Sequence, residues 1–396
     1  MSKILERVIH TQLITYLIDH DLLSPHQHGF RPSHSTQTAI LNITERVRSA
    51  IDERMVSVLV SFDFSKAFDP IPHRRLLVQL SEIGCDDLSI RWFVDYLSLR
   101  SLAVRNADGS HFHLYRTTSG VPQGSVLGPL LFLIYINSLL SILSHSHAII
   151  FADDTQIISH APPSQFRDLV SRMSADANAV HQWALDNGLS LKAQKTRVLL
   201  LGSRVFINAL SRANPPIIVL AGTILEYSPS VKIFGLVLDS KLNWDAQISS
   251  VSSKIHYALY SLRHHRNSLS RYLRLRLVQV LIVPHLDYAA AALTSLTAEQ
   301  KLRLQCLQNA CIRFIYGNIP RMAHVTPYRL ALEQSINTKF TLHDCSPWAI
   351  VRGPGAFAPS ALAWRWSWRA APAFWLVPLR VGAHWVSLCF CKYINM

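Results

Sequence analysis

The sequence predicts an α+β fold, in which an antiparallel sheet is combined with several helices. Two short apolar runs flank the adjacent pair Asp153 and Asp154, and this pattern predicts a strand–turn–strand hairpin. A further apolar run, residues 56–62, predicts a strand that ends at Asp63. Residues 246–286 instead repeat their apolar side chains at helical spacing. A hairpin, a separate strand and long helices in one chain are typical of the α+β class.

The length and composition of the chain allow a globular protein of several domains. Its 396 residues suit two or three domains, and the 49% share of hydrophobic residues is enough to form a core. That composition excludes a chain that is disordered throughout. The formal net charge of +14 is typical of nucleic-acid binders, and an anionic membrane surface is the weaker alternative partner.

The sequence indicates an intracellular protein, in the nucleus or the cytoplasm, that is not secreted. The six cysteines fit no zinc-binding spacing, so we expect them to be reduced. Charged residues interrupt the N-terminal apolar residues, so we expect no signal peptide. Residues 126–143 are apolar enough for a membrane span, but Gly128, Pro129 and Asn137 favour a buried helix against a sheet.

Helices and strands alternate in the first half of the chain. Residues 3–23 place their apolar side chains on one helical face, and a second helix begins at Ser35 and runs to about Arg54. Further elements follow the strand that ends at Asp63. In order, they are a helix from about Leu76 to Ile83, a helix over about residues 90–100, a polar hairpin over residues 101–121, and an apolar helix from Ser125.

The second half of the chain begins with a helix and three strands, continues as a basic helical module and ends in a segment without apolar periodicity. A helix is expected over about residues 164–186, closed by the C-cap pair Asn187-Gly188. Three strands are then expected, at about 196–202, 217–220 and 231–238. Residues 246–286 contain no acidic residue, so their lysines and arginines carry charge without counter-charges. Residues 336–396 hold six of the nine tryptophans and sustain no apolar period.

The two adjacent carboxylates at the hairpin tip need a compensating positive charge. Like charges this close raise one another's pKa unless a cation lies between them. With Asp63 at the end of another strand, the pattern favours Mg²⁺, a hard ion that prefers carboxylate and phosphate oxygens. The alternative is a capped turn and a strand-end aspartate that form ordinary salt bridges.

Six short motifs occur in a fixed order along the chain. They are Gln27-x-Gly29-Phe30-Arg31, Phe62-Asp63-Phe64-Ser65-Lys66-Ala67-Phe68-Asp69, Ser119-Gly120-Val121-Pro122-Gln123-Gly124-Ser125-Val126-Leu127-Gly128-Pro129, Phe151-Ala152-Asp153-Asp154, Asn187-Gly188-Leu189-Ser190 leading to Lys195-Thr196, and Val231-Lys232-Ile233-Phe234-Gly235-Leu236-Val237-Leu238-Asp239. In this order they resemble the reverse transcriptase domain of non-LTR (LINE-type, jockey-like) retrotransposons. The resemblance covers about residues 3–335.

The resemblance implies a right-hand polymerase fold, with fingers and palm in residues 1–240 and a helical basic thumb in residues 241–335. Residues 336–396 are a divergent Trp-rich tail outside it. The implied activity is RNA-directed DNA polymerisation by two-metal nucleotidyl transfer onto a primer 3′-hydroxyl. The implied cofactor is Mg²⁺, with Mn²⁺ as a substitute. The implied partners are an RNA template, a DNA primer and deoxynucleoside triphosphates, and no membrane is expected.

The resemblance also implies roles for the acidic motifs and one lysine. Asp63 and Asp153 are expected to bridge both metal ions, and Asp154 to add negative field or a further ligand. Lys195 is expected to donate a proton to the leaving pyrophosphate as a general acid. A solvated lysine at a strand edge is the alternative reading of Lys195.

Four further residues are expected to bind the substrate. Phe68 would lie under the sugar and exclude a 2′-hydroxyl, unless it is an ordinary core side chain. Arg31 would contact the triphosphate, unless it lies in a surface loop. Gln123 would hydrogen-bond the nucleotide or template, and Gly124 would let a base pair approach the backbone, unless both form a simple turn. Of Lys66 and Asp69, one is expected to be a surface charge and the other a cap of the next helix.

The chain also departs from the family pattern at both ends. Full-length elements carry an endonuclease domain before the polymerase, and residues 1–7 resemble the middle of the fingers, so we expect a truncated domain whose nucleotide and template binding are affected more than its metal site. The tail is expected to come from another reading frame or from readthrough. The alternative function is a catalytically inactive retroelement relic that binds nucleic acid through its thumb. A membrane-associated protein, suggested by residues 126–143 and the tail, is a further alternative.

Overall fold

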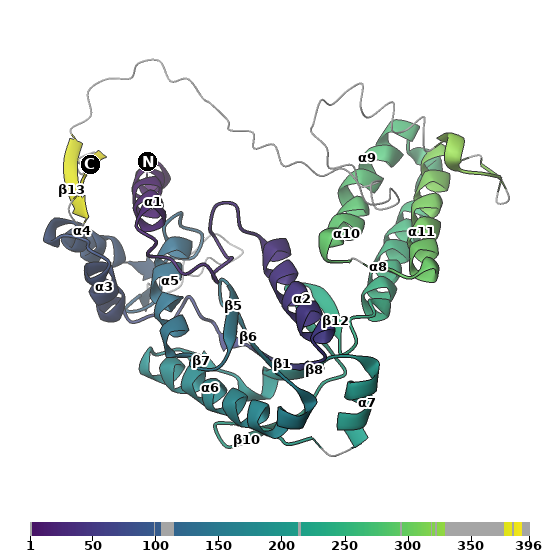
Figure 1. Ribbon diagram of the computed structural model, residues 1–396. Helices are drawn as coiled ribbons and strands as arrows, with labels where there is room; N and C mark the ends of the chain where they lie inside the picture. The colour runs from purple at the N-terminus through teal and green to yellow at the C-terminus, as the bar shows by residue number, and fades with distance from the viewer. Residues whose placement is uncertain are drawn as a thin grey trace. The chain divides into compact units, whose positions relative to one another are not determined.

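The computed structural model describes residues 2–328, apart from residues 99, 104–114, 213–214, 294, 318 and 321–322, together with residues 376–381 and 384–389. The chain divides into two compact units (Figure 1). One unit comprises residues 1–229 with 365–396, and the other comprises residues 230–364. The domain boundaries at residues 240 and 335 stay predictions.

A four-stranded antiparallel sheet is the centre of the first unit. Its order is β5-β6-β1-β8, with β5 at His147–Phe151, β6 at Asp154–Ala161, β1 at Val56–Phe62 and β8 at Arg197–Leu201. Phe62 pairs with Thr155 on one side of β1, and Ser61 pairs with Arg197 on the other. The predicted hairpin and the predicted strand before Asp63 are therefore neighbours in one sheet.

Helices cover both faces of this sheet, so its strands are buried on both sides. Helix α2 (Thr36–Asp52) packs on β1, β5 and β6, and α6 (Phe166–Asp186) packs on β1 and β6 from the other side (Figure 1). Val58 and Leu59 on β1 point to opposite faces, and both are fully buried. This double burial explains why β1 reads as a continuous apolar run rather than as an alternating one.

The apolar segment that raised the membrane question is a buried helix, as predicted. It forms α5 (Gly128–Ile136) followed by a 3₁₀ helix at Asn137–Ile142, and every residue of α5 except Pro129 is buried in the core of the first unit. Asn137 ties the end of α5 to the N-terminal segment, because its amide donates to the Leu22 carbonyl at 2.8 Å.

The remaining elements of the first unit largely follow the predicted order. They are α1 (Ser2–Asp19), β2 (Phe64–Ser65), α3 (His73–Glu82), α4 (Asp87–Leu97), β3 (Ser101–Leu102), β4 (Tyr115–Arg116), β7 (Ser190–Leu191), α7 (Arg204–Arg212), β9 (Ile218–Leu220) and β10 (Thr223–Leu225), with short 3₁₀ turns at Pro163–Gln165 and Ala193–Lys195. Pairing of β3 with β4 forms the stem of the predicted polar hairpin, whose tip lies outside the described residues. The short strands β2, β7 and β10 and the helix α7 were not predicted.

The second unit begins with a hairpin where the sequence predicted a single strand over residues 231–238. Strands β11 (Ser230–Ile233) and β12 (Leu236–Asp239) are antiparallel partners. The turn between them is made by Phe234 and Gly235, which have φ angles of 48° and 83°. Two successive residues with positive φ are typical of a two-residue hairpin turn, and the single-strand prediction overlooked this signal.

Four helices follow this hairpin, as the basic helical pattern predicted. They are α8 (Asp245–His264), α9 (Arg271–Leu281), α10 (Val283–Asp287) and α11 (Ala298–Tyr316), with 3₁₀ turns at Arg266–Ser268 and Ala290–Ala292. Side chains of these helices hold the hairpin. The Val237 N–H donates to the Gln247 side-chain oxygen at 3.0 Å, and the Tyr288 hydroxyl donates to the Phe234 carbonyl.

One stretch of the second unit resembles a membrane span by length and composition. Residues Arg271–Ala292 reach a mean hydropathy of 1.2, but the helix is interrupted at Ile282, where α9 ends and α10 begins. Three arginines, among them Arg274, lie on α9, and 28% of the stretch is buried inside the protein. This stretch is weak evidence for a membrane span.

Near the C-terminus, β13 (Leu376–Val381) and β14 (His384–Cys389) pair as an antiparallel hairpin.

Glu6 connects the N-terminal helix to the start of α5. Its side chain is buried, and one carboxylate oxygen accepts the N–H of Val126 at 2.6 Å and that of Leu127 at 3.4 Å. The first N–H groups of a helix have no partner within the helix, and they favour a negative group nearby. Glu6 therefore supplies acceptors that the apolar residues around α5 cannot supply.

Replacing Glu6 with alanine is expected to lower the free energy of unfolding by about 2 kcal/mol, because it leaves buried N–H groups without an acceptor. Urea unfolding measures this change. The matched control is Lys3→Ala, at an exposed position of the same helix, which should change stability by at most about 0.5 kcal/mol. Equal effects of the two substitutions would show that the Glu6 contacts contribute nothing specific.

Candidate active site

The turn of the β5–β6 hairpin presents the first two carboxylates. Phe151 pairs with Asp154 as the last pair of the hairpin, so Ala152 and Asp153 form a two-residue turn. Ala152 has a φ of 57° and is buried, which suits a small side chain under a tight turn. Asp153 is half-buried and Asp154 is exposed, so both carboxylates are at the end of the sheet and within reach of solvent.

The register of the sheet brings the third carboxylate to the same end. Phe62 is opposite Thr155, so the next position along β1 sets Asp63 beside Asp154. On the other side of β1, Ser61 pairs with Arg197 of β8. Two residues further along the same antiparallel register, Asp63 and Lys195 come to lie opposite each other. The Lys195 Nζ lies 3.6 Å from the Asp63 Oδ2, so the lysine and all three aspartates share one edge of the sheet.

The carboxylates influence one another electrostatically. The pKa of Asp153 is raised above its ordinary value, first by partial loss of hydration and then by the negative charge of Asp63. The pKa of Asp154 is raised by loss of hydration and by the charges of Asp153 and Asp63. The fold therefore holds negative charges closer together than they would be in the unfolded chain.

Such a site favours a cation, and its donor chemistry suits Mg²⁺. Carboxylate oxygens are the ligands that this hard ion prefers, and each raised pKa reflects lost hydration first and repulsion second, both of which a bound cation would offset. Within the part of the chain that the structure describes, no three Asp, Glu, His or Cys side chains lie close enough to enclose an ion by themselves. Oxygen ligands from a bound phosphate would complete the coordination, as is usual for Mg²⁺.

Lys195 is held only loosely by its neighbour. The side chain of Lys195 is 58% exposed and that of Asp63 is 43% exposed, so water screens the pair and the contact adds little stability. The lysine ammonium group is therefore free to turn from Asp63 toward an incoming anion.

Phe68, five residues after Asp63, is packed against two other aromatic rings. Its ring stacks on Phe132 of α5 with a centroid distance of 4.2 Å, and the Phe30 ring approaches edge-on at 6.3 Å. Phe68 is half-buried, so it has one face in the core and leaves part of its surface accessible. The stack on Phe132 fixes the ring, and its expected role under the sugar stays a prediction.

Gln123 and Gly124 lie on an exposed loop that is fastened to the segment after β2. The Val121 N–H donates to the Phe68 carbonyl at 3.0 Å, and the Gln123 amide donates to an Asp69 carboxylate oxygen at 2.7 Å. Gly124 has a φ of 75° and open space where a side chain would begin. The loop therefore leaves its backbone accessible next to Phe68.

Asp69 and Gln27 contribute contacts that the sequence did not predict. Asp69 was expected to be a surface charge or a cap, but Pro72 occupies the N-cap of α3 and Asp69 instead orients Gln123. Gln27 belongs to the first motif, yet no role was assigned to it, and it contacts the turn that bears Asp153. The position of both residues inside motifs was the only signal in the sequence.

Arg31 helps to hold its own loop. Its guanidinium donates to the Ser24 carbonyl at 2.7 Å. Its expected contact with the triphosphate stays a prediction.

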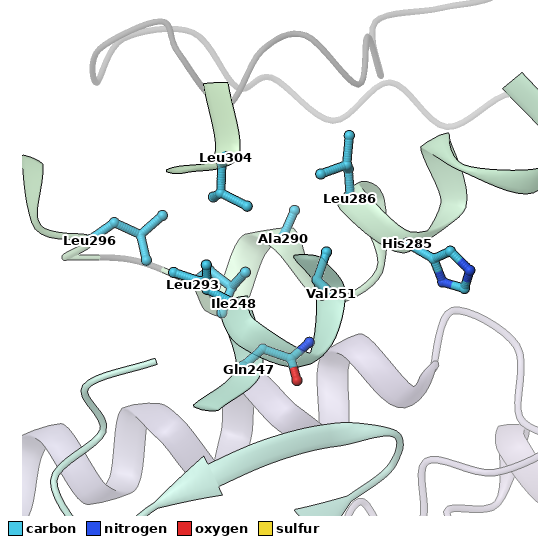
Figure 2. Close-up of a pocket in the computed structure, with 9 residues that line it drawn as sticks. All are labelled: Gln247, Ile248, Val251, His285, Leu286, Ala290, Leu293, Leu296 and Leu304. Carbon is cyan, nitrogen blue, oxygen red and sulfur yellow. The ribbon is translucent and has the colours of Figure 1, made fainter. Parts of the chain in front are cut away.

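The second unit contains a small hollow that differs from the carboxylate site in chemistry. Figure 2 shows its lining, which is mainly aliphatic and comes from Gln247, Ile248, Val251, His285, Leu286, Ala290, Leu293, Leu296 and Leu304. A lining without carboxylates or cationic clusters suits packing between helices better than phosphate chemistry.

Comparisons with known proteins agree with this site. The sequence profile of the family described as reverse transcriptase (RNA-dependent DNA polymerase) matches residues 1–238. The match includes every aspartate of the candidate site and spans more than half of the chain. The chain belongs to the reverse transcriptase family, and the α+β right-hand polymerase fold predicted from the motifs is the fold of this family.

Several relatives are encoded by mobile elements. The chain is 24% identical over 337 residues to the probable RNA-directed DNA polymerase from transposon X-element of Drosophila melanogaster, covering 80% of this chain and 34% of that protein. It is 23% identical over 327 residues to the RNA-directed DNA polymerase from mobile element jockey of the same species, with the same coverage. The chain thus spans about a third of the length of these relatives. These relatives confirm the predicted resemblance to non-LTR retrotransposon reverse transcriptases.

Solved structures of telomerase are also similar to the chain. The apo telomerase of Candida tropicalis matches 87% of this chain and 60% of its own chain, with a TM-score of 0.45 and 12% sequence identity.

The raised pKa values predict that the site destabilises the folded protein. Above the ordinary aspartate pKa of 3.8, the carboxylates are ionised and hydrated in the unfolded chain, whereas the fold removes part of their hydration and holds their charges close together. Asp153→Asn is therefore expected to raise the melting temperature at pH 7. The gain should shrink as pH falls through the raised folded pKa and vanish below the ordinary value.

Thermal unfolding between pH 4 and pH 8 tests this expectation. Asp95→Asn, at an exposed position on α4, is the control and should give no comparable gain. A melting temperature for Asp153→Asn that is unchanged or lower at pH 7 would contradict the electrostatic account of the site.

Proposed function

We propose that the chain is an RNA-directed DNA polymerase module that adds deoxynucleotides to a primer 3′-hydroxyl on an RNA template. One observation carries the proposal. Asp63 and the pair Asp153 and Asp154 come from separate segments, and the sheet register assembles them at one edge beside Lys195. Family membership supports the same reaction class.

In this proposal, Asp63 and Asp153 hold the metal, and Asp154 adds negative field beside them. Two divalent ions, Mg²⁺ or in its place Mn²⁺, would supply charge neutralisation at the attacking hydroxyl and at the leaving pyrophosphate. The rigid sheet fixes the aspartates that hold them, so little reorganisation is needed during the reaction.

Lys195 is suited to assist the leaving group. Its ammonium lies beside Asp63 at the edge where the pyrophosphate would leave, and its exposed side chain can reach an anionic oxygen. A proton donated to that oxygen makes pyrophosphate a better leaving group. Asp63 would hold Lys195 near this position between reaction cycles.

The residues around Phe68 would select and orient the nucleotide. The Phe68 ring is fixed by its stack on Phe132, so it cannot yield easily to a 2′-hydroxyl placed against it. Asp69 holds the Gln123 amide nitrogen, which leaves the Gln123 carbonyl oxygen available to a nucleotide or template. Open space at Gly124 permits close approach of a base pair to the backbone.

The helical second unit would hold the template–primer duplex. Helix α8 presents two exposed aromatic residues, Tyr257 and Tyr260, which are 76% and 64% exposed. Lysine and arginine residues without acidic neighbours lie on the same helix, at Lys254 and Arg263. Such groups contact phosphates and sugars without reading sequence, so affinity should fall steeply with salt.

Asp153→Asn is expected to abolish primer extension on a poly(rA)/oligo(dT) template, with a loss of roughly 10³-fold or more, because a residue that acts as part of a catalytic unit cannot be replaced by its neighbours. Gel-resolved extension with Mg²⁺ and Mn²⁺ in parallel measures the loss. Asp95→Asn is the control.

The same assay separates the proposal from the inactive alternative. Duplex binding without extension by the unaltered protein, with either ion, would favour a catalytically inactive retroelement relic. Unchanged extension by purified Asp153→Asn protein would contradict the assignment of the site.

Phe68→Ala is expected to raise incorporation of ribonucleotides relative to deoxynucleotides by about tenfold or more, because removing a ring that clashes with a hydroxyl removes a penalty of more than about 1.4 kcal/mol. Competitive single-nucleotide incorporation measures the ratio. Phe132→Leu removes the stacking partner but keeps the Phe68 ring, so it should change the ratio less. An unaltered ratio in Phe68→Ala protein would assign Phe68 to the core alone.

A further inference from the structure

Gln27 is buried directly beneath the turn that bears Asp153. Its side chain is 2% exposed, and its amide oxygen accepts the Ala152 N–H at 3.1 Å and the Gly29 N–H at 2.7 Å. One oxygen thus joins a loop of the fingers to the turn of the hairpin. The two segments are far apart in sequence, so the contact depends on the tertiary fold.

The backbone on either side of Gln27 reinforces this contact. The His28 N–H donates to the Ile150 carbonyl at 2.7 Å, and the Ile150 N–H donates to the His26 carbonyl at 3.0 Å. These bonds form a parallel bridge between Gln27 and Ile150, at the end of β5. The fingers loop therefore extends the palm sheet next to the aspartate turn.

Gly29 shows how closely the loop approaches the turn. A Cβ atom added at Gly29 would lie 2.3 Å from the Ala152 backbone nitrogen, which no side chain can occupy. Ala152 itself has a positive φ of 57°, which residues other than glycine adopt only when their surroundings impose it. The Gln27 oxygen is one of the groups that impose it.

The chemistry of Gln27 suits this position better than that of an acidic residue. A carboxylate could accept the same two N–H groups, but its charge would add to the repulsion near Asp153 and Asp154. The nitrogen of the Gln27 amide is buried and has no hydrogen-bond partner in the described part of the chain. A buried amide whose nitrogen has no hydrogen-bond partner costs folding free energy. The presence of Gln27 here therefore favours a specific role for its oxygen, which accepts the two N–H groups.

We propose that Gln27 is a positioning residue for the catalytic turn. By holding the Ala152 N–H, it fixes the turn conformation that directs Asp153 and Asp154 toward the volume they share with Asp63. It acts through the backbone and touches neither the nucleotide nor the metal. The hydrogen bond between the Ala152 N–H and Gln27 is seen in the structure itself. Its effect on catalysis rests on the proposed polymerase activity.

The experiment compares Gln27→Met with Gln156→Met. Methionine has a similar length and fills the same volume but accepts neither N–H. Gln156 is a matched control, because it is equally buried, lies on β6 of the same hairpin and makes no contact with the turn through its side-chain oxygen. Amide hydrogen exchange at Ala152, thermal unfolding and single-nucleotide incorporation are measured for both variants.

For Gln27→Met we expect faster exchange at Ala152 by about tenfold or more, with core amides of β1 unchanged. We expect kcat to fall by about 10- to 100-fold with KM for the nucleotide within about twofold, because displaced carboxylates impair the chemical step rather than binding. Gln156→Met should leave both exchange at Ala152 and kcat within about twofold of the unaltered protein.

A Gln27→Met protein that folds and retains slow exchange at Ala152, or retains kcat, would overturn the proposal. Gln27→Glu keeps an acceptor oxygen at the same reach and should keep Ala152 protected, even where Gln27→Met fails to fold. Fast exchange at Ala152 in Gln27→Glu would also overturn it. If the unaltered protein extends no primer, the proposed polymerase activity fails, while the exchange measurements still decide whether Gln27 holds the turn.

Discussion

The antiparallel register between β1 and β6 is the constraint on which the candidate site depends. Phe62 pairs with Thr155, and one step further along both strands sets Asp63 beside Asp154. A slip of one residue would turn every β1 side chain to the opposite face, so the packing against α2 on one face and α6 on the other would both have to be rebuilt. Side-chain packing in the core thus fixes the register, and the register fixes the distance between carboxylates. Their repulsion is the consequence, and it is what makes the site suited to a cation.

Loops from distant parts of the sequence then pack around this edge and hold it in shape. The Gln27–Gly29 loop extends the sheet beneath the turn, and the loop bearing Gln123 is fastened to the segment from Phe68 to Asp69. Phe68 is itself fixed by α5 through Phe132. Each of the first five motifs therefore contacts another motif in the folded chain. Polar contacts between these loops therefore hold the carboxylates in the arrangement that the register of the sheet creates.

Much of this arrangement could be predicted from the sequence, and the failures have physical causes. The strand before Asp63, the hairpin at Asp153 and the basic helices were predictable, because their apolar patterns reflect burial within a single element. The hairpin at Phe234-Gly235 was missed because its two strands are apolar and the turn is only two residues long. The contacts of Gln27 and Asp69 could not be predicted, since a side-chain hydrogen bond to a distant loop leaves no periodic pattern. The hydrogen bond from Arg31 to Ser24 was likewise not predictable, since it depends on the local course of the loop.

The most direct test of the account measures Mn²⁺ bound per chain by electron paramagnetic resonance. The sample holds a template–primer that ends in a dideoxynucleotide, together with the next deoxynucleoside triphosphate, so that the site is loaded but cannot react. The account predicts about two ions per chain for the unaltered protein and binding weakened by at least about tenfold for Asp63→Asn, since Asp63 is one of the residues proposed to hold the ions. Equal Mn²⁺ binding by the two proteins would contradict the claim that the sheet register assembles a metal-dependent polymerase site.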